Sequence, residues 1–159
     1  MRPEISLRPI TENDRDFLYN LYANSRETEL AQVVWQQMPM DKTTFLTSQF
    51  EAQHHHYTTN FIGANFSIVM WNDKPIGRFY IDHRQEEIRL LDIILLPEYR
   101  NQGIGSAFLT NILDEAKQMS VPVRLHVEYD NPAMNLYQRF GFYCLEDKGV
   151  YKLMEWQPN

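Results

Sequence analysis

Cysteine is almost absent from this sequence, which has 159 residues and one thiol, Cys144. An internal disulfide is therefore excluded, and because no nucleophile motif surrounds Cys144 we expect it to be a small core residue. No apolar run approaches the roughly 20 residues that a membrane-spanning helix needs. The first residues contain neither a basic segment nor an apolar segment of the secretory kind, so we expect a cytoplasmic protein.

Basic residues are also fewer than acidic ones: the sequence has 15 Lys and Arg residues and 21 Asp and Glu residues, which gives a formal net charge of −6. This balance argues against nonspecific binding to nucleic acid or to an anionic membrane, and it suits a cationic amine as substrate. The hydrophobic share of 43% is ordinary for a globular chain. The length predicts a single domain over residues 1–159 with a core of its own.

The stretch Leu90–Ala107 has the pattern of a strand, a tight loop and the start of a helix. The strand is apolar except for Asp92 and ends at Pro97, and apolar residues recur at helical spacing through Ser106–Met119. A loop of this kind aims backbone N–H groups and the positive end of a helix dipole at one point. The pattern therefore predicts a phosphate-binding loop.

The residues of this loop favour a diphosphate-bearing ligand but exclude two common nucleotide-binding motifs. Gly103 and Gly105 allow close backbone approach and positive φ angles, and Arg100 adds a positive charge. A Rossmann fingerprint needs a small residue where Phe108 stands, and a Walker loop needs a Gly-Lys-Ser/Thr sequence that is missing.

The loop instead resembles the acetyl-CoA loop of the GNAT superfamily of N-acetyltransferases. The family signature Arg/Gln-x-x-Gly-x-Gly/Ala matches the residues from Arg100 to Gly105, and a second family block matches Asn131–Phe142. Two motifs in this order, about thirty residues apart, make the resemblance specific. It implies an acetyl-CoA-dependent N-acetyltransferase, that is, an acyltransferase.

The hydrophobic pattern along the chain predicts an α+β fold. Its order is one strand, two helices, three strands, a helix, a strand, a helix and two final strands. Asp41 is a plausible N-cap for the second helix, and Val123–Glu128 is a strand with one apolar and one polar face. The resemblance implies the GNAT acyl-CoA N-acyltransferase fold, with a mixed central sheet of about seven strands flanked by about four helices.

The resemblance also implies which residues bind acetyl-CoA as cosubstrate. Backbone groups of Ile94 and Leu95 match the contacts to the pantetheine arm, and Asn131 matches an asparagine that contacts the same arm, although Asn-Pro also suits a simple helix start. Tyr137 matches the tyrosine that protonates the CoA thiolate, with a core tyrosine as the alternative. The pyrophosphate cradle matches Arg100, Gln102, Gly103, Ile104, Gly105 and Ser106.

The general base is left open among three residues. An alkyl amine with a pKa near ~10.4 is protonated at neutral pH, so the reaction needs a base or a water path. Asp92 is an acid in an apolar strand, a costly position unless it is paired or used. His126 stands where some relatives carry a glutamate, and Glu128 shares its face. Each is alternatively a structural partner of a nearby arginine, Arg78, Arg89 or Arg124.

No metal site is expected, because the three imidazoles of His54–His56 point about 100° apart on a helix. The predicted function is transfer of an acetyl group to a primary amine by direct attack in a ternary complex. The acceptor is a small-molecule or peptide amine, without nucleic acid or membrane, and the protein is a monomer or homodimer. The alternatives are a noncatalytic acyl-CoA-binding or regulatory module and an unrelated binding protein whose glycine loop is only a turn.

Overall fold

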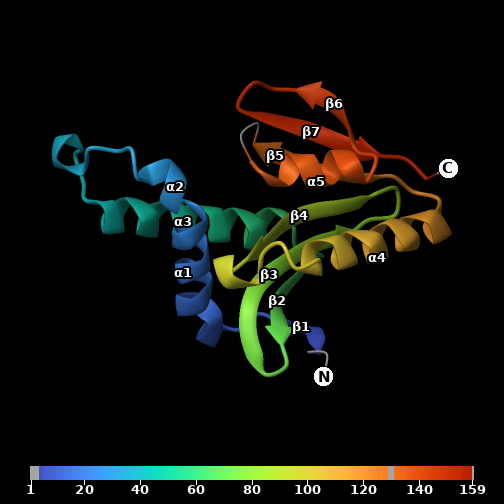
Figure 1. Cartoon of the computed structure of the whole chain (residues 1–159), viewed down its shortest axis with the longest axis horizontal. Helices are drawn as coiled ribbons and strands as arrows, with labels where there is room; N and C mark the ends of the chain where they lie inside the picture. The colour runs from blue at the N-terminus through green and yellow to red at the C-terminus, as the bar shows by residue number, and fades with distance from the viewer. Residues whose placement is uncertain (1–3, 129–130, 159) are drawn as a thin grey trace. The chain divides into compact units, whose positions relative to one another are not determined.

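The computed structural model describes residues 4–128 and 131–158, and its strands form one mixed sheet in the order β1-β2-β3-β4-β5-β7-β6 (Figure 1). β4 and β5 are parallel, whereas β1 with β2, β5 with β7 and β6 with β7 are antiparallel. The elements are β1 (Ile5–Pro9), α1 (Arg15–Ser25), α2 (Glu27–Leu30), α3 (Lys42–Asn60), β2 (Asn65–Trp71), β3 (Lys74–His83), β4 (Ile88–Leu95), α4 (Ile104–Met119), β5 (Val123–Glu128), α5 (Ala133–Arg139), β6 (Tyr143–Asp147) and β7 (Tyr151–Trp156).

This order confirms the predicted α+β fold with a seven-stranded mixed sheet. The described residues contain one more α-helix than expected, the single-turn α2. None of the helices in the described ranges is long and apolar enough to cross a lipid bilayer.

The chain divides into two compact units. The first contains the described residues up to Phe79 together with Ile94–Glu98, and the second contains Tyr80–Ile93 and the described residues from Tyr99 onward. That both units form one domain over residues 1–159 stays a prediction.

The core of the first unit lies between α1, α3 and β2. Its buried side chains recur every three or four residues along each helix, as an amphipathic helix requires, and the ring of Tyr19 meets that of Phe50 edge-on at 5.7 Å. Asp41 caps α3 as predicted, because its Oδ1 accepts a hydrogen bond from the backbone N–H of Thr44 at 2.7 Å. The cluster comprises Leu18, Tyr22, Leu30, Leu46, Phe50 and Ile68.

The entry into α1 is held by the buried carboxylate of Asp14, which is 6% exposed. Arg8 donates to both of its oxygens, at 2.7 and 2.8 Å, and the backbone N–H of Thr11 donates at 2.8 Å. The hydrogen bonds from Arg8 hold the pKa of Asp14 below its usual range, against the opposing effect of burial.

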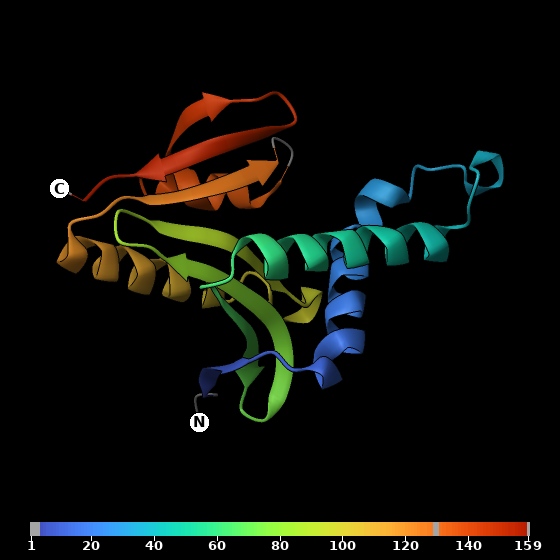
Figure 2. The same ribbon diagram turned by 180° about the vertical axis from the view of Figure 1, so that it is seen from behind.

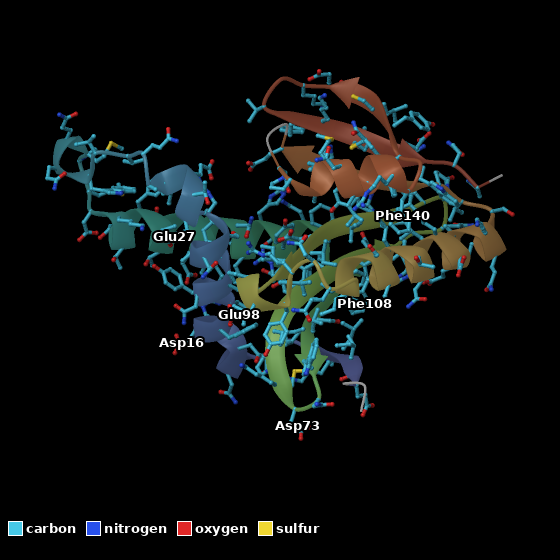
Figure 3. All side chains as sticks on the ribbon, in the orientation of Figure 1. Asp16, Glu27, Asp73, Glu98, Phe108 and Phe140 are labelled. Carbon is cyan, nitrogen blue, oxygen red and sulfur yellow. The ribbon has the colours of Figure 1, made fainter. Side chains whose placement is uncertain are left out.

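We expect Asp14→Ala to lower the free energy of unfolding by about 1–2 kcal/mol at pH 7, since it removes the acceptor of the Thr11 N–H and an ion pair with Arg8. Because the pKa of Asp14 is lowered in the folded state, this stabilisation is present above the unfolded pKa of about 3.9 and is lost as the pH falls through the folded pKa. Urea unfolding of both proteins at neutral and acid pH measures the difference. Asp16→Ala is the matched control, because Asp16 is exposed on α1 (Figure 3).

The second unit is built on β4, β5, β7 and β6. Alternate residues of β5 are buried, and registered pairs such as Val123 with Trp156 and Leu125 with Met154 share one apolar face. α5 lies in front of β5 in Figure 1 and behind it in Figure 2, and α4 also packs against β5. The opposite face of the same strands is polar and carries Arg89, Arg124, His126 and Glu155.

Cys144 is exposed, so the prediction that it is a core residue is wrong. It lies on β6, the last strand of the sheet, and every residue of this strand is exposed. The pairing of β6 with β7 also shifts register between Cys144 and Glu146. A short, bulged strand at the edge of a sheet has little apolar surface to bury, which the pattern Tyr143–Leu145 alone did not reveal.

Candidate functional site

The predicted phosphate loop ends at the N-terminus of α4. Gly103 precedes the helix with a φ of +85°, Asn101 has a φ of +60°, and the first helical bond joins the Ala107 N–H to the Gly103 carbonyl at 3.0 Å. The backbone N–H groups of residues 104–106 precede that bond and have no partner within the helix. The N-cap residue itself, Gly103, has no side chain with which to cap this end.

This cradle suits a diphosphate. A Cβ added to Gly103 would meet no heavy atom within 4 Å, so the loop presents open space at this point. The first turn of α4 carries no acidic residue, and its N–H groups and dipole favour an anion. Gly103 alone of the two predicted glycines has a positive φ, since Gly105 is helical. Phe108, labelled in Figure 3, lies half-buried one turn further along α4.

The cradle and Tyr137 are neighbours. A Cβ on Gly105 would lie 3.8 Å from the Cδ2 of Leu136, the residue before Tyr137 on α5. Tyr137 is 7% exposed, and its ring centroid lies 5.7 Å from that of Phe142. Burial raises the pKa of the Tyr137 hydroxyl well above its usual range, and the negative charge of Asp92 raises it further. The phenol is therefore held in its protonated form.

The pairing of β4 with β5 stops early. Within the second unit it covers only three pairs, from Ile88 with Val123 to Leu90 with Leu125, although both strands continue. The backbone edges of residues 91–93 and 126–128 are thus not paired with each other. Asp92 lies on the face of Leu90, towards Tyr137, whereas His126 and Glu128 alternate with buried Leu125 and Val127 and lie on the polar face.

His126 contacts an arginine, as the structural alternative predicted. Its Nδ1 lies 3.2 Å from Nη1 of Arg89, and its ring meets that of Tyr151 edge-on at 5.3 Å. Partial burial lowers the pKa of His126, and the charges of Arg89 and Lys148 lower it further. The imidazole is therefore neutral at pH 7.

Ile94 and Leu95 are half-buried residues at the end of β4, in the first unit. Gly77 on β3, which sequence reasoning missed as a functional position, lies so close to them that a Cβ there would come within 2.3 Å of the Ile94 carbonyl oxygen. Only glycine fits this approach, so Gly77 fixes where the Ile94 backbone lies. A glycine inside an otherwise regular strand was the available signal.

The remaining predicted cofactor residues belong to the second unit and differ in exposure. Arg100, Gln102 and Asn131 are exposed, whereas the side chain of Ile104 is buried beneath the loop, so only its backbone can meet a ligand. Asn131 accepts a hydrogen bond from the backbone N–H of Ala133 at 2.9 Å, which is the helix-start role foreseen as its alternative. Their contacts with a cofactor stay predictions.

The histidine run lies within α3 and its side chains diverge. His54 stacks on Phe50 at 5.8 Å, and His56 Nδ1 lies 2.7 Å from the side-chain amide nitrogen of Asn60. Within residues 4–128 and 131–158 no group of three or more His, Cys, Asp or Glu side chains is placed to hold a metal ion.

Sequence comparison finds related acetyltransferases. The chain is 32% identical over 102 residues to N-alpha-acetyltransferase 50 of Danio rerio, covering 59% of this chain and 61% of that protein. It is 29% identical over 154 residues to the histone acetyltransferase MCC1 of Arabidopsis thaliana, covering 90% and 62%. The chain thus spans about three fifths of the length of these two relatives.

Structural comparison finds the same fold. The PaiA N-acetyltransferase of Thermoplasma acidophilum, solved in complex with coenzyme A, superposes with a TM-score of 0.71 and 19% identity over 97% of this chain and 99% of that one. The profile of the acetyltransferase (GNAT) family matches residues 16–142, which include both motifs and Tyr137. The chain belongs to the acetyltransferase (GNAT) family.

Proposed function

We propose that this protein is an N-acetyltransferase that transfers an acetyl group from acetyl-CoA to a primary amine. The observation that carries the proposal is the N-terminus of α4, which begins after Gly103 in a left-handed conformation and lies next to the helix that contains Tyr137. Coenzyme A in the PaiA complex and the amine acetylation named for the relatives support it.

The reaction is a direct displacement. When bound, acetyl-CoA supplies a thioester whose carbonyl carbon is attacked by the neutral amine; a C–N bond forms and the C–S bond breaks. The backbone N–H groups of residues 104–106, with Arg100 and Gln102, would hold the pyrophosphate. The backbone of Ile94 and Leu95 would pair with the pantetheine arm. One proton leaves the amine for a base, and one proton reaches the leaving sulfur from Tyr137.

Tyr137 serves as the proton donor to sulfur. Its raised pKa keeps the phenol protonated across the neutral and mildly alkaline range, so the donor is always available. The same shift makes it a weak acid towards a thiolate of pKa near ~8.5, so a hydrogen bond to the sulfur stabilises the transition state before the proton moves. Turnover consequently shows no alkaline decline from Tyr137 below a pH of about 10.

The candidate bases are Asp92, His126 and Glu128, with a water path as the alternative. Asp92 shares the face of Tyr137, where its charge acts on the phenol. His126 and Glu128 lie on the opposite face, at the end of β5 where the pairing with β4 has stopped. Separate Asp92→Asn and Glu128→Gln variants, compared by their pH profiles of kcat/KM, identify a carboxylate base by the loss of the acid limb.

The acceptor is a small-molecule or peptide amine, which the acidic charge balance of the chain suits. The names of related proteins include both acceptor classes. Two relatives are named as an N-alpha-acetyltransferase and a histone acetyltransferase, and a structural neighbour is a spermidine N-acetyltransferase. A cytoplasmic location and a monomeric or homodimeric state complete the proposal.

The deciding experiment is calorimetric titration of acetyl-CoA into the purified protein, followed by a thiol-release assay with three amine classes. These are peptides with a free N-terminus, lysine-containing peptides with a blocked N-terminus, and polyamines. We expect micromolar or tighter binding and release of CoA thiol with at least one class. Binding without release in any class favours the noncatalytic module, and no binding overturns the assignment of residues 100–106.

A further inference from the structure

A chain of charged side chains crosses the polar face of the second unit and ends at His126. Nε and Nη2 of Arg89 lie 3.3 and 3.5 Å from the carboxylate oxygens of Glu87, and its Nη1 lies 3.2 Å from Nδ1 of His126. The side chains of Arg89 and Glu87 are 16% and 12% exposed. The carboxylate thus fixes the direction in which the guanidinium points.

The chemistry of the guanidinium and the imidazole decides how this contact works. A guanidinium carries only donors and does not lose its proton in proteins, so Nδ1 of His126 is the acceptor. In a neutral imidazole that accepts at Nδ1, the proton resides on Nε2. A second proton on Nδ1 would meet the N–H of Arg89 head-on. The nitrogen that remains for other partners is therefore a donor.

We infer that Arg89 is a positioning residue that keeps His126 neutral with its proton on Nε2, so that His126 donates a hydrogen bond in the reaction and is not its base. This inference rests on the proposed function for its catalytic half only. It leaves Asp92 and Glu128 as the candidate bases.

The groups that face His126 include both signs of charge. Arg89 lies on β4 and Glu87 directly before that strand, whereas Glu146 comes from β6, Lys148 from the following turn and the ring of Tyr151 from β7. Burial, Arg89 and Lys148 disfavour the imidazolium, and the two carboxylates favour it with smaller effect. Removal of the positive charge of Arg89 should therefore raise the pKa of His126.

Long-range proton–nitrogen NMR of the imidazoles tests the positioning claim without any substrate. The chain has five histidines, and the signals of His126 are identified by their loss in His126→Gln. We expect wild-type His126 to be the Nε2–H tautomer at pH 7, with a titration midpoint below the usual value of about 6.5. An Nδ1–H tautomer, or a midpoint above 6.5, overturns the inference.

Two variants separate the contact from general charge. Arg89→Met removes the donor but keeps an apolar stem, and we expect mixed tautomers of His126 and an upward shift of its titration midpoint. Arg89→Lys retains a charged donor and should restore much of the wild-type behaviour. Arg84→Met is the matched control. Arg84 also pairs with Glu87, at 3.4 Å, and it pairs with Asp82. Because these ion-pair partners are carboxylates, we expect Arg84→Met to leave the tautomer of His126 unchanged. Equal effects of Arg84→Met and Arg89→Met overturn the inference.

Activity tests the catalytic half. The amide of glutamine can donate where Nε2–H does but cannot take a proton, so a donor role predicts that His126→Ala loses about tenfold more kcat than His126→Gln. If His126 is instead the base, both variants should lose kcat equally, by about 10²-fold or more. If no amine is acetylated at all, the proposed function fails while the NMR result still decides the role of Arg89.

Discussion

Gly103→Val should weaken CoA binding by at least about 100-fold while the protein stays folded. Gly103 has a φ of +85°, a conformation that a β-branched residue adopts only at a cost of about 1–3 kcal/mol. Relief of that strain turns the following N–H groups away from the phosphates. Charge-assisted hydrogen bonds contribute about 1.5–3 kcal/mol each, so loss of one or two is enough for this change.

The chain offers a close control for this variant in Gly149. It also lies in a loop of the second unit, has a φ of +84° and is surrounded by open space, since a Cβ added there would meet no heavy atom within 4 Å. Gly149→Val therefore imposes the same backbone strain away from the cradle. Calorimetry with CoA and thermal unfolding of both variants give the comparison. CoA affinity of Gly103→Val within about twofold of wild type would show that the loop does not bind the diphosphate.

Tyr137→Phe should lower kcat by about 10²-fold and leave the affinity for acetyl-CoA nearly unchanged. The substitution keeps the buried ring and its packing on Phe142, and it removes only the hydroxyl that donates to the leaving sulfur. Steady-state thiol release measures kcat, and calorimetry measures affinity.

Tyr143→Phe serves as the control for loss of a phenol elsewhere in the same unit. Tyr143 lies on the exposed strand β6 and donates its hydroxyl to Glu155 on β7. We expect a small change in stability and no change in kcat. If Tyr137→Phe loses turnover and affinity to the same extent, Tyr137 acts by packing and the acid role is wrong; unchanged turnover favours a reaction without a protein acid.

The loop motif was predictable because its chemistry is local. Gly103 and the helix that begins at Ile104 need only neighbouring residues to build an anion site, and the spacing from Arg100 to Gly105 records that requirement. Asp41 as the cap of α3 is similar, since its acceptor reaches a backbone N–H three residues away. Cys144 was misplaced because its exposure depends on the position of β6 at the sheet edge, which no local pattern reports.

The sequence by itself determined the order of strands and helices, the glycine loop before α4 and the family, because each is encoded by periodicity or by residues close together in the chain. The tertiary structure alone decided which side chains from other strands each candidate base meets. Arg89 and His126 are 37 residues apart, and only the parallel register of β4 with β5 brings the guanidinium to Nδ1. A histidine can act as a hydrogen-bond donor or as a base. The neighbour across the sheet determines which of these roles it takes.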